Sequence, residues 1–183
     1  FDSLNITTTL YYMRLRSEIS TTDNSFYNRN LAPTERYGIE NNFKYSFMKN
    51  LNIENAFTLT QAKFRGGDRN ENDLPGVPAF VDSLQINYSP LKNLSTYFNF
   101  YYQSSSRPLN DFRNYQIVQK GYHTFNIGFV GSFKGYKASL ALNNLQDKIH
   151  YNYAVGSGSG VYHTVSYYPL PGFNTLFKIS KEF

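Results

Sequence analysis

The last eleven residues of the chain, 173–183, alternate between two kinds of side chain. In an extended strand successive side chains point to opposite faces, so alternate residues share a face. The apolar face would carry Phe173, Phe177, Ile179 and Phe183. The polar face would carry Asn174, Lys178, Ser180 and Glu182. Such a strand is typical of the one that closes a transmembrane β-barrel, with lipid on one side and an aqueous lumen on the other. A strand of a soluble β-sandwich shows the same alternation and is the alternative.

The same period of two recurs along the whole chain. It predicts about eight strands, at roughly 4–19, 36–48, 51–64, 80–88, 94–103, 119–133, 136–145 and 173–183. In the clearest case Tyr37, Phe43 and Phe47 alternate with polar neighbours. Asn41 and Asp82 are polar residues at positions that should be apolar. No window shows the 3.6-residue period of an amphipathic helix, so the fold class is all-β.

The predicted connections are of two lengths. Tight turns fall at 48–51, 89–93 and 134–135, whereas long polar stretches fall at roughly 20–34, 65–78, 105–115 and 150–171. Bacterial outer-membrane barrels have short periplasmic turns and long extracellular loops. The pattern therefore predicts an antiparallel transmembrane β-barrel segment.

The composition fits this prediction. Hydrophobic residues make up 40% of the 183 residues, the mean hydropathy is −0.51, and no stretch approaches the ~20 apolar residues of a membrane helix. In a barrel only alternate residues face lipid, so average hydropathy conceals the membrane face. The 17 Tyr and 16 Phe suit the aromatic belts at the two membrane interfaces. The length favours a single domain.

Several classes of function are disfavoured. The net charge of +5 is spread along the chain without a basic run, so no nucleic-acid partner is expected. There is no Cys, and the three His are not at ligand spacing, so neither a metal site nor a cofactor is expected. Acidic and amide side chains at 68–73 weakly suggest a calcium loop, but a solvated loop is the simpler reading. Without a nucleophile and base in a recognisable arrangement, no enzymatic activity is expected.

Four segments resemble the C-terminal part of TonB-dependent outer-membrane receptors. Glu35-Arg-Tyr-Gly-Ile-Glu40 resembles that family's strand start of Gly, an aliphatic residue and Glu. Leu74-Pro-Gly-Val-Pro78 resembles its proline-marked approach to a strand. Asn143-Asn-Leu-Gln-Asp-Lys148 resembles the signature before its last extracellular loop, and Tyr167-Tyr-Pro-Leu-Pro-Gly172 resembles the approach to its closing strand.

The resemblance implies a bacterial outer-membrane receptor that imports a scarce, bulky solute, such as a ferric siderophore or cobalamin, by energy-coupled transport. Such receptors form barrels of about 22 strands around a plug, so residues 1–183 would be a C-terminal barrel segment without the plug domain and the earlier strands. The implied partners are those strands and the plug, a TonB-type energy-coupling protein, the barrel-insertion machinery and outer-membrane lipid. The alternative is a complete eight-stranded barrel that acts as a structural anchor or adhesin, for which the length is suitable.

Two sets of candidate site residues follow. The resemblance implies that the closing strand carries the assembly signal, at its outward residues Phe177, Ile179 and Phe183. Ligand contact is expected at the long-loop end, from Arg107, Arg113, Tyr162, His163 and Tyr167. Aromatic rings offer rigid contact area and arginine offers a planar fork for anionic groups, which together suit a bulky, partly anionic chelate. Alternatively, these tyrosines belong to the interfacial belt and the arginines contact lipopolysaccharide phosphates.

Overall fold

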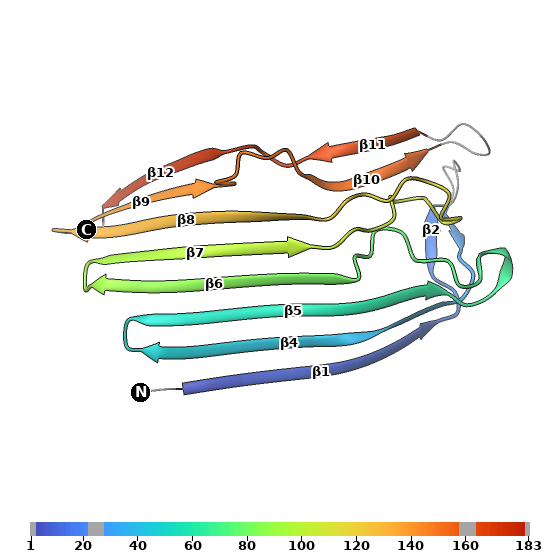
Figure 1. Ribbon diagram of the computed structural model, residues 1–183, viewed down its shortest axis with the longest axis horizontal. Helices are drawn as coiled ribbons and strands as arrows, with labels where there is room; N and C mark the ends of the chain where they lie inside the picture. Colours follow the sequence, from blue (N-terminus) through green and yellow to red (C-terminus); the bar gives the residue numbers. More distant parts are fainter. Residues whose placement is uncertain (1–2, 22–27, 158–163, 182–183) are drawn as a thin grey trace.

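The computed structural model describes residues 3–21, 28–157 and 164–181, and its main feature is one antiparallel sheet of eight strands. The strands follow one another in space almost as they do in the sequence (Figure 1). They are β1 (Ser3–Leu15), β4 (Thr34–Met48), β5 (Leu51–Phe64), β6 (Phe80–Leu91), β7 (Leu94–Gln103), β8 (Tyr122–Phe133), β9 (Tyr136–Asn143) and β12 (Asn174–Lys181). The predicted all-β class and the eight main strands are confirmed.

Two short hairpins and one 3-10 turn lie in the connections, where the sequence predicts only loops. They are β2 (Ile19–Thr21) with β3 (Asn28–Asn30), β10 (Tyr151–Ser157) with β11 (Thr164–Pro169), and η1 (Gly67–Arg69). The first strand also ends at Leu15 rather than near residue 19, and β8 starts at Tyr122 rather than near residue 119. Within the described residues, no helix is long and apolar enough to cross a membrane.

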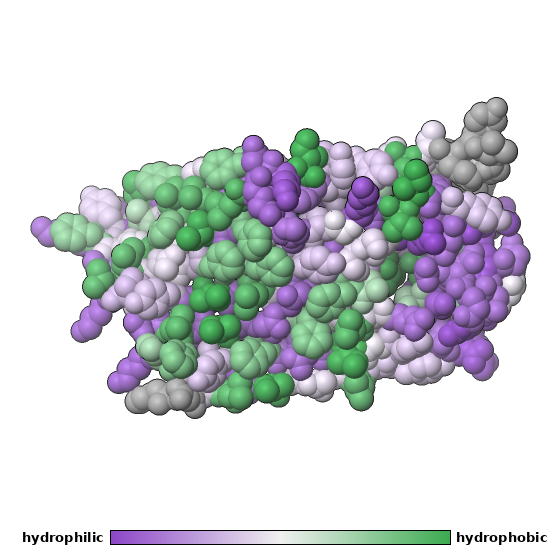
Figure 2. Space-filling model, in the orientation of Figure 1, coloured by the Kyte–Doolittle hydropathy of each residue, from purple (hydrophilic) through white to green (hydrophobic). Residues whose placement is uncertain are grey.

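The register places the apolar residues of neighbouring strands on one face. Tyr45 pairs with Ile53 and Ile53 with Ile86, while Phe98 pairs with Ile127. Figure 2 shows the resulting band of hydrophobic residues, which covers much of the sheet and stops before the long-loop end. The opposite face is polar, and on it Lys44 and Glu54 form an ion pair of 3.2 Å. The sheet thus has the two faces that a barrel wall needs.

The polar residues on the apolar face bond to one another across strands. The Asn41 amide donates to the Thr8 hydroxyl at 2.7 Å, and the Asn55 amide donates to the Asp82 carboxylate at 2.7 Å. A polar group without a partner is costly in an apolar medium. These hydrogen bonds explain how Asn41 and Asp82, which are polar at positions predicted to be apolar, are tolerated on this face.

Gly38 is required because an aromatic side chain crosses over it. Tyr11 on β1 lies opposite Gly38, and its hydroxyl reaches Thr60 on β5 at an oxygen–oxygen distance of 2.7 Å. A Cβ at Gly38 would overlap the carbonyl oxygen of Leu59 and approach the Tyr11 hydroxyl to 2.7 Å. The glycine of the Glu35–Glu40 motif therefore allows two strands and a tyrosine to pack closely.

The two ends of the sheet differ as predicted. The three tight turns, the start of β1 and the end of β12 lie at one end, and the long connections lie at the other (Figure 1). In the β8–β9 turn Lys134 and Gly135 both have positive φ, of 48° and 80°, as in two-residue hairpins whose twist matches that of the strands.

Hydrogen bonds between the connections on either side of the β10–β11 hairpin hold β12 beside β9. The buried amide of Asn144 donates to the carbonyl oxygens of Lys148 at 2.8 Å and Pro171 at 3.1 Å. The Asp147 carboxylate accepts the backbone N–H of Phe173 at 2.9 Å. The two motifs at 143–148 and 167–172 therefore contact each other directly.

The closing strand has the predicted faces. Phe177 pairs with Leu140 and Ile179 with Ala138, on the apolar side, and both side chains are exposed. Lys181 lies on the same side with its ammonium group 5.4 Å from the centre of the Tyr136 ring. Phe183 lies outside the described residues. The sheet does not close on itself, because β1 and β12 are its two edges.

Candidate ligand-contacting loops

The connections at the long-loop end pack together around a small apolar core. Its buried members come from three connections and the end of β5, and they are Leu31, Ala62, Phe64, Leu74 and Phe112. The rings of Phe64 and Phe112 meet edge to face, with centroids 6.0 Å apart. This core fixes the loops relative to the sheet, so their outer residues can form a defined surface.

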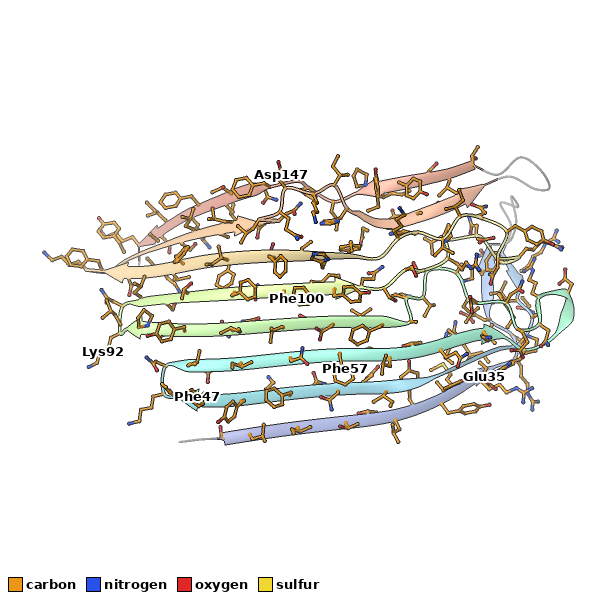
Figure 3. The ribbon with its side chains drawn as sticks, in the orientation of Figure 1. Glu35, Phe47, Phe57, Lys92, Phe100 and Asp147 are labelled. Atoms are coloured by element: carbon orange, nitrogen blue, oxygen red, sulfur yellow. The ribbon has the colours of Figure 1, made fainter. Side chains whose placement is uncertain are left out.

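Two ion-pair networks surround this core. Arg36 donates to both carboxylate oxygens of Glu18, at 2.8 and 2.9 Å, and the Thr34 hydroxyl donates to the same carboxylate. On the opposite face of β4, Arg65 donates twice to Glu35, at 2.9 and 2.8 Å, and also pairs with Glu71. Figure 3 shows Glu35 at this end of the sheet. The sequence pattern did not predict these ion pairs, because their members come from different connections and strands.

Arg107 is held inside the loop assembly. Its guanidinium donates to the carbonyl oxygens of Asn114 and Gln116, both at 3.3 Å, and lies 3.9 Å from the Asp73 carboxylate. It also lines a cleft of about 680 Å³ between the β4–β5 strands and the 104–121 connection. These contacts support the loop, and they occupy donors that an anionic ligand would need.

Arg113 is more open. Its guanidinium pairs with Asp68 at 3.0 Å, and the side chain keeps 48% of its surface exposed. Asp68 and its neighbours are used in contacts between loops: Asn72 donates to the carbonyl of Phe112, and Asp73 accepts through its backbone from Asn114. Among the described residues no cluster of three acidic or histidine side chains could hold a metal ion.

The β10–β11 hairpin presents a ladder of tyrosines. Tyr151 contacts Tyr167 at a centroid distance of 4.9 Å, and Tyr153 stacks on Tyr168 at 4.4 Å with an interplanar angle of 18°. All four rings are exposed. Tyr162 and His163, which lie between the two strands in sequence, are outside the described residues.

The hairpin is docked on the 104–121 connection. Leu109 donates to the Ala154 carbonyl and Gly156 donates to the Leu109 carbonyl, both at 2.7 Å. A Cβ at Gly156 would overlap the side chain of Gln116, so glycine permits this close approach. The structure thus brings the loop of Arg107 and Arg113 next to the hairpin of Tyr167.

His150 does not add positive charge to this surface. It is buried against Tyr122, with the two rings stacked 5.3 Å apart. Burial lowers the pKa of His150, and the nearby His123 and Lys148 lower it further. The lowered pKa keeps the imidazole mainly neutral at pH 7, so His150 adds no positive charge for an anionic ligand.

The open, two-faced antiparallel sheet with all its long loops at one end defines the wall of a membrane β-barrel. The family model described as "TonB dependent receptor-like, beta-barrel" matches residues 1–145. The chain belongs to this family. Its members are receptors and transporters and not enzymes, which confirms the expected lack of catalysis.

Solved structures show the same fold. The ferric yersiniabactin uptake receptor FyuA from Yersinia pestis superposes with a TM-score of 0.77 at 17% identity, over 96% of this chain and 27% of FyuA. The ferric-catecholate import receptor Fiu from K12 E. coli gives 0.75 at 16% identity, over 98% and 25%. The copper transporter OprC gives 0.75 at 17% identity, over 98% and 29%. A search of curated proteins gives no match. The chain spans about a quarter of the length of these receptors.

Proposed function

We propose that this chain is the C-terminal barrel segment, residues 1–183, of a receptor in the bacterial outer membrane that imports a scarce, bulky solute by energy-coupled transport. A ferric siderophore, cobalamin or a similar metal chelate is the solute class. The observation that carries the proposal is the open eight-stranded sheet, which corresponds to about a quarter of solved receptors for ferric siderophores and copper. The remaining strands and the plug would complete the barrel, and a TonB-type protein would supply the energy.

A complete eight-stranded barrel serving as anchor or adhesin is the second candidate, because the sheet has eight strands. Both of its edge strands lack a neighbour on one side. In hydrocarbon each unsatisfied backbone group costs several kcal/mol, so only closed barrels are viable there. This observation favours the receptor segment.

The test is whole-cell uptake by the full-length receptor in a host that lacks its own receptors for the supplied solutes. A panel of iron-55 siderophores and cobalt-57 cobalamin is offered, in matched strains with and without the TonB protein. Uptake of one solute that requires TonB is expected. Absence of uptake across the panel, together with a compact heat-modifiable form of residues 1–183 alone, would instead support the small barrel.

We propose that the ligand contacts the β10–β11 hairpin and the neighbouring 104–121 connection, at Arg113, Tyr162, His163 and Tyr167. Arg107 would contribute indirectly, by holding the 104–121 connection in its conformation. We expect Arg113→Ala and Tyr167→Ala to weaken equilibrium binding of the transported solute by roughly tenfold each, as for loss of a charged hydrogen bond or an aromatic contact. Arg113→Lys, which keeps the charge but not the fork, is the matched variant. Unchanged affinity in both alanine variants, at normal surface expression, would move recognition to other parts of the receptor.

The outward residues of the closing strand are proposed to carry the assembly signal read by the insertion machinery. We expect Phe177→Asp and Ile179→Asp to reduce the amount of receptor in the outer membrane sharply, because a charged side chain on the lipid face of a barrel strand is destabilising. Ser180→Asp, which places the same charge on the opposite face, is the control. Equal insertion of the outward and inward variants, measured by fractionation and heat-modifiable migration, would contradict the assignment.

A further inference from the structure

The three tight turns at the end of the sheet where β1 starts and β12 ends share a simple pattern. In each, a lysine directly follows a large apolar residue, as Met48-Lys49, Leu91-Lys92 and Phe133-Lys134. The three apolar side chains are exposed. An apolar belt with ammonium groups at its edge is the arrangement found where a protein surface leaves the hydrocarbon and meets lipid headgroups.

Two of these turns enclose a cleft of about 500 Å³. It lies between the β6–β7 and β8–β9 turns, which are joined by a hydrogen bond of 2.9 Å from the Ser132 N–H to the Asn93 carbonyl. Its walls combine three lysines with apolar and aromatic residues, and they include Lys92, Lys134, Lys137, Leu94, Phe133 and Tyr136. Figure 3 shows Lys92 at this end of the sheet.

Among the described residues, no carboxylate offsets the positive charge of the cleft. None of the described residues that line it is acidic. Lys92, Lys134 and Lys137 are exposed, and among the described ion pairs none involves them. At the long-loop end, by contrast, Arg65 and Arg113 each pair with a carboxylate. Like charges gathered around a concave surface attract counter-ions, so this cleft favours an anion.

The apolar walls indicate which anion fits. Phe133 and Tyr136 pair across β8 and β9 on the apolar face of the sheet, and both are exposed. The Lys134 ammonium lies 5.2 Å from the centre of the Phe133 ring, where it can reach a headgroup while the ring stays in the acyl region. A ligand that fills the whole site is anionic at one end and apolar at the other.

We propose that this cleft binds an anionic phospholipid of the membrane leaflet at the turn end. The phosphate group lies between Lys92 and Lys134, at the edge of the apolar face, and the acyl chains run along Leu94, Phe133 and Tyr136 on that face. The proposal rests on the membrane location given under the proposed function, but it does not depend on transport.

The experiment measures lipid binding to the full-length receptor purified in detergent, by native mass spectrometry. Phosphatidylglycerol is the probe and phosphatidylethanolamine is the zwitterionic reference. We expect the receptor to prefer phosphatidylglycerol and Lys92→Gln/Lys134→Gln to weaken its binding about 25-fold, since each lysine near an anionic surface contributes about fivefold. Lys120→Gln/Lys148→Gln, with the same change of net charge at the long-loop end, should bind like the unaltered receptor.

The outcomes are distinct. Equal binding of the two lipids by the unaltered receptor, or equal loss in the two double variants, would overturn the site. The lipid site would also be overturned if the Lys92→Gln/Lys134→Gln variant kept the preference for phosphatidylglycerol but no longer bound a soluble acidic periplasmic protein that the unaltered receptor binds. That result would identify the cleft as a protein interface. If the receptor prefers phosphatidylglycerol through this cleft but takes up no solute, the result supports the lipid site and contradicts the proposed transport function.

Discussion

Gly38→Ala is expected to prevent most of the full-length receptor from reaching a folded state in the outer membrane. The added methyl group would overlap the Leu59 carbonyl oxygen and crowd the Tyr11 hydroxyl, which bonds to Thr60 across the glycine. The carbonyl belongs to the backbone of β5 and cannot rotate away as a side chain can. Overpacking of this kind costs about 1–3 kcal/mol and sometimes more. The measurements are the heat-modifiable fraction and the unfolding free energy in urea.

Two controls isolate the cause. Gly131→Ala is expected to change stability by less than about 0.5 kcal/mol, because the nearest heavy atom to its added Cβ is Asn93 O at 3.9 Å. At Gly128 the atoms in the way belong to the Tyr97 ring, so Tyr97→Ala should rescue Gly128→Ala. Tyr11→Ala should not rescue Gly38→Ala, since the Leu59 carbonyl remains. Folding of Gly38→Ala at the level of Gly131→Ala would refute the close approach.

Asn144→Ala is expected to loosen the connection between β9 and β12. The change removes both hydrogen bonds from the buried amide to Lys148 and Pro171, and loss of such bonds costs about 1–3 kcal/mol. It also places Ala at a φ of 50°, where a left-handed conformation costs roughly 1–2 kcal/mol. The expected result is faster hydrogen exchange along β12, beginning at the Phe173 amide, and less receptor in the membrane.

Asn144→Gly separates the two contributions, because glycine tolerates the positive φ but cannot make the bonds. We expect Asn144→Gly to be intermediate between the unaltered receptor and Asn144→Ala. Asp147→Asn, which keeps an acceptor oxygen for the Phe173 N–H, should have a smaller effect than either. Unchanged exchange of the β12 amides in Asn144→Ala would show that the strand pairing alone places β12.

Part of the candidate site could be predicted from the sequence alone. The long-loop end, its tyrosine content and the order of its connections follow from the position of polar stretches between strands. The roles of individual side chains do not follow. Arg107 and Arg113 are six residues apart in the same loop, yet Arg107 supports that loop and Arg113 is nearly half exposed. Their difference depends on Asp73 and Asp68, which come from another connection.

The sequence by itself determined the class of structure, because its main signal is local. Alternation along a strand sets which side chains share a face, and turn residues such as Lys134-Gly135 set where the chain reverses. These are properties of neighbouring residues, so the eight strands and their faces were readable without a partner strand. Asn41 and Asp82 were readable only as misfits, since their partners, Thr8 and Asn55, lie on other strands.

Only the tertiary structure decided how distant segments meet. Tyr11 crosses Gly38 to reach Thr60, Asn144 reaches Pro171, and the β6–β7 and β8–β9 turns enclose one cleft of lysines. Each of these contacts joins residues separated by tens of positions in the chain, and each depends on strand register and packing. A shift of one residue in register would turn every side chain of a strand to the other face. The sequence pattern requires two faces, but which residues touch across them is fixed only when the whole sheet is assembled.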